Sequence, residues 1–139
     1  MSTGSAFRVG VFVFDDAEEL DVVGPYEVLA TWAALSGLRP EVLTFSADGA
    51  GVRLAKGLRI VPERSADDVV PLHVLVYPGG RGTRTLARDP AHLAWLRGLR
   101  AEVSLLAMAI RSAATWAARW ALACRRGRPA RRPGRVAWV

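Results

Sequence analysis

Apolar residues gather in short continuous runs separated by polar breaks, and four of these runs have the composition of buried strands. Runs rich in β-branched, aliphatic and aromatic residues are typical of strands covered on both faces. The four runs are Phe7–Phe14, Pro40–Phe45, Leu72–Tyr77 and Val103–Ala107. Two shorter runs, 52–54 and 58–61, flank Ala55-Lys56-Gly57 and predict a small hairpin.

Two segments between these runs carry helical patterns. Tyr26–Leu35 has one apolar stripe, and Pro25 suits the first turn of a helix that begins there. A second helix is predicted over Pro90–Leu99, with Asp89 as its N-cap. Because strands alternate with helices and parallel strands need crossovers, we predict an α/β fold with a parallel sheet and helices on both faces.

In sheets of this kind, ligands bind beyond the C-terminal ends of the strands. The predicted strands end at three segments of interest: Asp15–Asp21, Pro78–Gly82 and Met108–Ser112. Candidate functional residues are therefore expected in these three segments.

Composition sets the broad class of the protein. The chain has 139 residues, of which 51% are hydrophobic and 23% charged, so it is one domain with a useful core. No apolar run reaches the roughly 18 residues that span a bilayer, and residues 1–6 lack the features of a secretory signal. A single cysteine, Cys124, excludes an internal disulfide. We expect a cytoplasmic protein without membrane contact.

Charge is distributed unevenly along the chain. Residues 1–110 carry 11 Lys and Arg against 13 Asp and Glu, whereas residues 111–139 carry 8 Arg and no acid. The net charge of +6 therefore comes from the last 29 residues. Such a tail is typical of a solvated segment, and the alternative is nonspecific binding to nucleic acid, with Trp116, Trp120 and Trp138 as possible stacking groups.

Three segments together resemble a known family. They are Val11–Leu29, which contains Leu-Asp-Val-Val-Gly-Pro, Leu75–Gly82, which contains Pro-Gly-Gly, and Leu93–Ala107. They resemble the DJ-1/PfpI (class I glutamine amidotransferase-like) family, in the branch of isonitrile hydratases and the N-terminal domains of AraC-type regulators. The likeness covers residues 7–107. It implies a flavodoxin-like fold, incomplete at the C-terminus, and a homodimer.

The resemblance also implies a site. In the family a nucleophilic cysteine follows the fourth strand, a carboxylate faces it, and backbone amides beside a glycine pair form an anion pocket. By position, Asp21 matches the carboxylate, and Gly79 and Gly80 match the glycine pair. The cysteine position falls on Ile110, and Arg111 follows it in the pocket backbone. Isoleucine cannot act as a nucleophile, so the resemblance implies half of a catalytic site.

Beyond Arg111 the family pattern is lost, and we divide the chain accordingly. Residues 1–110 form a partial DJ-1/PfpI-like domain. Residues 111–139 comprise an Ala/Trp-rich helix, over Ala113–Ala123, and a basic Arg/Pro-rich tail predicted to be disordered at its end. A shift of reading frame near residues 107–110 is one hypothesis that explains both the lost cysteine and the tail.

Simpler interpretations accompany the candidate residues. Asp21 also suits the first turn of a helix, and Gly79, Gly80 and Gly82 also suit a tight turn. We interpret the other polar candidates as structural or solvent-exposed residues: Glu18, Glu19, Arg81, Thr83, His73, His92 and Cys124. No spacing indicates a metal site, and no cofactor is predicted.

Three functions remain open. The first is a non-catalytic domain that binds a small molecule or serves regulation, as in AraC-type sensors. The second is an isonitrile hydratase-like or amidase-like enzyme, which would need another nucleophile. The third is a nucleic-acid-binding regulator that uses the Arg-rich tail.

Overall fold

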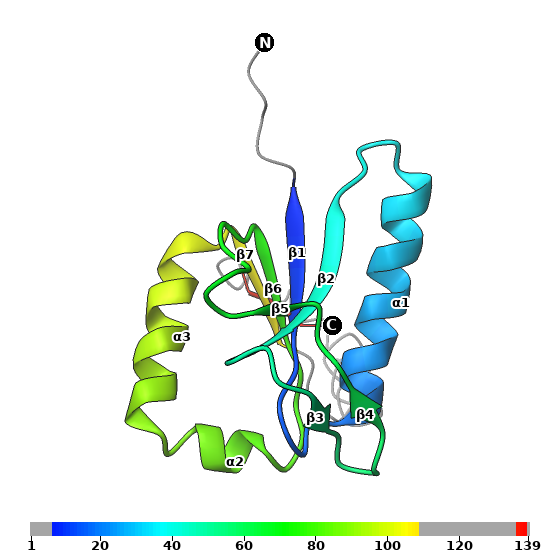
Figure 1. Cartoon of the computed structure of the whole chain (residues 1–139). Coiled ribbons are helices and arrows are strands. Elements are labelled where there is room, and N and C mark those ends of the chain that lie inside the picture. Colours follow the sequence, from blue (N-terminus) through cyan, green and yellow to red (C-terminus); the bar gives the residue numbers. More distant parts are fainter. Residues whose placement is uncertain (1–6, 109–135, 139) are drawn as a thin grey trace, which may run out of the picture.

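A computed structural model of the chain describes residues 7–108 and 136–138, and its centre is a six-stranded parallel sheet (Figure 1). The strands lie in the order β5-β2-β1-β6-β7-β8. Their bounds are β1 Arg8–Phe12, β2 Glu41–Ser46, β5 Arg64–Ser65, β6 Val74–Tyr77, β7 Leu105–Met108 and β8 Val136–Trp138. Apart from the short edge strand β5, this is the 2-1-3-4-5 order of flavodoxin-like folds. The predicted fold class is confirmed.

Helices cover both faces of the sheet. Figure 1 shows α1, Glu19–Leu35, on one side and α3, Pro90–Glu102, on the other. A short helix, α2 at Thr83–Leu86, precedes α3 and was not predicted. The predicted hairpin is present as β3, Val52–Arg53, paired antiparallel with β4, Arg59–Ile60. Within the described ranges, no helix is long and apolar enough to cross a bilayer.

Aromatic packing joins the sheet to α3. The Phe12 ring on β1 lies 5.3 Å from the Phe45 ring on β2 and 5.0 Å from the Trp95 ring on α3. Gly10 makes room for this packing, because a Cβ there would lie only 2.8 Å from side-chain atoms of Phe45 and Leu72. The predicted buried runs are thus the core, and Asp89 caps α3 as expected, accepting the Ala91 N–H at 2.9 Å.

Helix α1 starts six residues earlier than predicted. We placed Pro25 in the first turn, but the helix begins at Glu19 and Pro25 lies inside it. The start is set by tertiary contacts, because the loop before it is held by the backbone of the Pro78–Gly82 turn, with Glu18 N–H donating to Gly79 C=O at 2.9 Å. Local sequence signals do not contain that information.

The end of the chain also differs from the prediction. Val136–Trp138, which lies in the tail predicted to be disordered, forms β8 and pairs parallel with β7. β8 thus covers the outer edge of β7. The helix predicted over Ala113–Ala123 lies outside the described residues.

Candidate functional site

Two loops meet at the point where the strand order reverses, between the C-terminal ends of β1 and β6. The loop after β1 and the Pro78–Gly82 turn after β6 are joined by backbone hydrogen bonds. Besides the bond from Glu18 to Gly79, Gly82 N–H donates to Asp16 C=O at 3.2 Å, and Ala17 and Gly80 form an antiparallel bridge. The crevice where such folds bind ligands is therefore closed on this side.

Gly80 is required by this closure. Its φ of +127° is a conformation that L-residues rarely adopt. A Cβ at this position would lie 2.5 Å from both Asp16 C=O and Glu18 N. The simpler interpretation of Gly80, as a residue of a tight turn, is thus supported by the backbone.

Asp21 reaches the same turn from the first turn of α1. Its Oδ2 accepts a hydrogen bond from Gly79 N–H at 3.2 Å, so the structure brings two of the predicted site residues together. The bond has a second consequence. The Gly79 N–H donates to Asp21 Oδ2, and the Gly82 N–H donates to Asp16 C=O. Neither N–H group is therefore directed at an anion in this arrangement.

Glu18 and Glu19 were expected to be solvated loop acids, and that expectation is wrong. Glu18 is only 7% exposed and pairs with the Lys56 ammonium. Glu19 accepts the Lys56 backbone N–H. Burial raises the pKa of Glu19, but backbone N–H groups and the Lys56 charge outweigh it and leave the pKa below its ordinary value. These acids fasten the β3–β4 hairpin to the start of α1.

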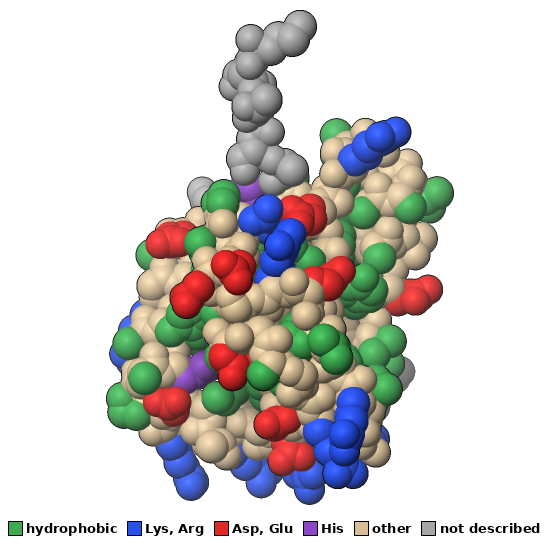
Figure 2. Space-filling view, in the orientation of Figure 1, with side chains coloured by type: hydrophobic (Ala, Val, Ile, Leu, Met, Phe, Trp, Pro, Cys, Tyr) green, Lys and Arg blue, Asp and Glu red, His purple; other side chains and the backbone are tan. Residues whose placement is uncertain are grey.

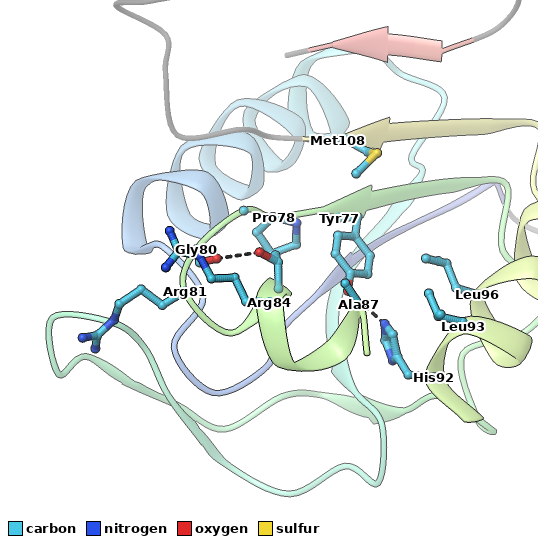
Figure 3. Close-up of a pocket in the computed structure, with 12 residues that line it drawn as sticks. Tyr77, Pro78, Gly80, Arg81, Arg84, Ala87, His92, Leu93, Leu96 and Met108 are labelled. Carbon is cyan, nitrogen blue, oxygen red and sulfur yellow. Dashed lines mark hydrogen bonds between the residues drawn. The ribbon is translucent and has the colours of Figure 1, made fainter. Parts of the chain in front are cut away.

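A cavity of about 660 Å³ opens on the other side of the Pro78–Gly82 turn, between β6, β7, α2 and α3 (Figure 3). Leu93 and Leu96 of α3 and Met108 of β7 give it apolar walls. Arg84 of α2 is an exposed cation at its rim, and no ion pair of Arg84 is formed with the described residues. Arg81 is exposed as predicted and pairs with Asp16 at 2.9 Å.

Tyr77 and His92 form a buried hydrogen-bonded pair that lines the cavity. The Tyr77 hydroxyl lies 2.9 Å from His92 Nε2, and the two residues are 6% and 9% exposed. Burial raises the pKa of Tyr77 to about 12. Burial also lowers the pKa of His92, and the nearby Asp89 charge only partly offsets this. Both side chains are therefore uncharged near neutral pH.

Sequence reasoning missed this pair. Tyr77 was assigned only to a strand, and His92 was set aside as a residue of an amphipathic helix. A signal was present, because His92 shares the inward stripe of α3 with Trp95, Leu96 and Leu99, and a polar group on such a stripe needs a partner. His73 is more ordinary, since its Nδ1 accepts the Arg8 N–H at 3.1 Å.

Of the remaining candidates, Thr83 donates from its hydroxyl to Gly80 C=O at 2.7 Å and lines the cavity, whereas the others lie outside the described residues. They are Ile110, Arg111 and Cys124, so the relation of the cysteine position to Asp21 and Gly79 stays a prediction. Among the described residues, no group of three His, Cys, Asp or Glu side chains could hold a metal ion.

Solved structures of similar fold match large parts of the chain. An AraC family transcriptional regulator from Pseudomonas putida is 22% identical, with a TM-score of 0.65, and the match covers 96% of this chain and 80% of that one. A ThiJ/PfpI family protein from Pseudomonas syringae is 23% identical, with a TM-score of 0.62, over 76% of this chain and 42% of that one. At these identities the likeness shows the fold.

Sequence comparison identifies the family. An isonitrile hydratase from Pseudomonas putida is 30% identical over 97 residues, which are 70% of this chain and 40% of that protein, so the chain spans less than half of this relative. The sequence profile of the DJ-1/PfpI family matches residues 7–126. Our limit of residue 107 for the resemblance was therefore too early. The chain belongs to the DJ-1/PfpI family.

Proposed function

We propose that this domain binds a small molecule without chemical turnover and serves regulation, as a sensor-like member of the DJ-1/PfpI family. The observation that carries the proposal is the cavity at the C-terminal ends of β6 and β7. Its volume of about 660 Å³ falls in the range of small-molecule sites, which are apolar and contain a few convergent polar groups. Leu93, Leu96 and Met108 supply apolar walls, and Tyr77 and His92 supply buried polar groups.

A blocked cavity tests this proposal. Ala87 lines the cavity at the end of α2, whereas its neighbour Arg88 is exposed and does not line it. We expect Ala87→Trp to abolish the binding of small aromatic probes in an NMR titration, and Arg88→Trp to leave it unchanged. Binding that persists in the Ala87→Trp variant would place the ligand elsewhere and contradict the proposal.

The absence of turnover rests on Ile110 at the family's cysteine position. The chain is similar to a protein named isonitrile hydratase, so the test is hydration of an alkyl isonitrile, in which water adds to give the N-substituted formamide. We expect no turnover above the rate in buffer. Thiol-sensitive turnover would favour the enzyme alternative, and loss of that turnover in Cys124→Ser would identify Cys124, the single cysteine, as its nucleophile.

We also propose a homodimer through the outer face of α1. Leu20, Val28 and Leu35 are 72%, 67% and 81% exposed, and apolar side chains follow the edge of the molecule that α1 forms (Figure 2). Large exposed apolar patches mark interaction sites. We expect Val28→Glu to convert a dimer to a monomer in light scattering, and a wild-type monomer would contradict this proposal.

Nucleic-acid binding by the Arg-rich tail and a cytoplasmic location remain predictions of the sequence. A salt titration of DNA binding tests the former. Steep salt dependence supports counterion release by the tail, and no retention on DNA at low salt removes this alternative.

A further inference from the structure

We propose that the Tyr77–His92 pair selects the ligand of this cavity, and that it selects an uncharged molecule with an amide or similar group that both donates and accepts hydrogen bonds. This inference rests on the proposed small-molecule site and specifies its ligand class. Figure 3 shows the two side chains facing one another, with Leu93 and Leu96 beside His92.

The pair is held in place by rings on several sides. Phe12 lies 5.5 Å from Tyr77 and 5.8 Å from His92, measured between ring centroids, and Trp95 lies 5.2 Å from His92. Phe14 packs at 5.6 Å on Tyr77. Side chains whose orientation is fixed by packing lose little entropy when a ligand binds. The pair therefore presents its polar atoms in one arrangement.

Hydrogen-bonding capacity determines the ligand group. A tyrosine hydroxyl donates one hydrogen bond and accepts others, and a neutral imidazole donates from one nitrogen and accepts at the other. The bond between the Tyr77 hydroxyl and His92 Nε2 uses one donor and one acceptor. Depending on the imidazole tautomer, the hydroxyl is left to accept or to donate. A primary amide satisfies either arrangement, since it carries both a carbonyl and an N–H group.

Burial argues against a charged ligand group at this pair. Neither partner is charged near neutral pH, so an ionic group placed against them would be desolvated without a counter-charge, which is costly. Arg81 and Arg84 are cations that line the cavity, but Arg81 pairs with Asp16, and Arg84 is exposed at the rim, where ionic attraction is weak. The buried pair and the exposed cation thus make opposite predictions about ligand charge.

Three probes of similar size and different charge separate these predictions: benzamide, benzoate and benzylammonium. Each has an aromatic ring for the walls formed by Leu93, Leu96 and Met108. We expect benzamide to bind the full chain at least about threefold more tightly than either ion, which is the effect of one neutral hydrogen bond. If benzoate binds most tightly, Arg84 determines the ligand class and the inference is overturned.

Substitutions of Tyr77 and His92 test whether these two residues cause the preference for benzamide. Tyr77→Phe keeps the ring and removes the hydroxyl, and we expect it to weaken benzamide binding about three- to tenfold with little effect on benzoate. Tyr26→Phe is the matched control, because Tyr26 is the other tyrosine of the chain and lies on α1. His92→Gln retains a hydrogen-bonding side chain, so the preference for benzamide should be partly kept, whereas His92→Leu should lose it.

The failure of this inference differs from the failure of the proposed function. If none of the three probes binds the wild-type chain at millimolar concentration, the small-molecule site itself is contradicted. If probes bind and Ala87→Trp blocks them, but Tyr77→Phe leaves the benzamide preference unchanged, the site stands and the role of the pair is overturned.

Discussion

The two sides of the Pro78–Gly82 turn differ in how they are filled. Toward β1 the turn is closed by backbone hydrogen bonds to the loop after β1, and Asp21 accepts the hydrogen bond of the Gly79 N–H. Toward β7 the turn borders an open cavity whose buried polar side chains are Tyr77 and His92. The first side is filled by the hydrogen bonds of the turn itself, including the one from Gly79 to Asp21, whereas the second, which Gly79 and Gly80 also line, offers side-chain groups able to bind a ligand.

The motif glycines thus shape the turn that borders both sides, whereas side chains from β6 and α3 supply the buried polar groups of the cavity. Gly80 packs backbone against backbone and tolerates no side chain, which explains the need for glycine there without reference to a ligand. A cavity lined by side chains depends on residues from several elements and carries no short motif.

The largest effect is expected at the closed side. Gly80→Ala places a Cβ against the backbone of Asp16 and Glu18 at a positive φ, and we expect it to lower the free energy of unfolding by about 3 kcal/mol or more. Gly98→Ala on α3 is the control, because no atom lies within 4 Å of the added Cβ. It should be neutral or stabilise by up to about 1 kcal/mol. Urea unfolding of both variants measures this, and equal stabilities would contradict the closure.

A smaller loss is expected on the cavity side. Tyr77→Phe leaves the buried His92 Nε2 without its partner, so the free energy of unfolding should fall by about 1–2 kcal/mol. The ring contacts with Phe12 and Phe14 are retained, and the variant should still fold. Urea unfolding beside Tyr26→Phe measures the difference, and an unchanged midpoint would mean that water replaces the hydroxyl without loss.

The pH dependence of stability should also report on His92. Burial lowers its pKa below the ordinary value of 6.5, so the unfolded chain binds a proton that the folded chain does not. The stability from neutral His92 is therefore present above about pH 6.5 and is lost as pH falls toward the lowered pKa. His92→Gln should show a smaller loss of stability between about pH 7.5 and 5.5 than the wild type. Parallel curves would contradict this assignment.

The smallest effect is expected from Asp21→Asn. The amide oxygen can still accept the Gly79 N–H, and only the negative charge in the first turn of α1 is lost, at a cost of about 0.5 kcal/mol. Asp21→Ala removes the acceptor as well and should cost about 1 kcal/mol more. Unfolding curves of the two variants distinguish charge from hydrogen bonding, and equal costs would mean that the hydrogen bond contributes little.

Several parts of the fold could be predicted because their signals are local. The buried runs that became β1, β2, β6 and β7 were found with small shifts at their ends, and Asp89 was found as the cap of α3. The start of α1 could not be found, since Pro25 is a strong local signal for a first turn. Backbone contacts from residues about 60 positions away overrode it.

The candidate site was only half predictable for the same reason. Asp21 and Gly79 could be paired from sequence because a family resemblance supplied their proximity, and the structure joins them. Tyr77 and His92 lie 15 residues apart on a strand and a helix. Whether they touch depends on the register of β6 in the sheet and on the rotation of α3 about its axis.

The sequence by itself determined which segments are strands and helices, where their chain reversals need glycine, and to which family the pattern is similar. Those properties follow from short-range periodicity and from the steric demands of single residues. The tertiary structure alone decided that β8 covers β7, that Glu18 and Glu19 fasten the hairpin through Lys56, and that an uncharged pair lines the cavity. Each of these depends on contacts between residues distant in the chain, whose geometry is fixed only when the layers pack.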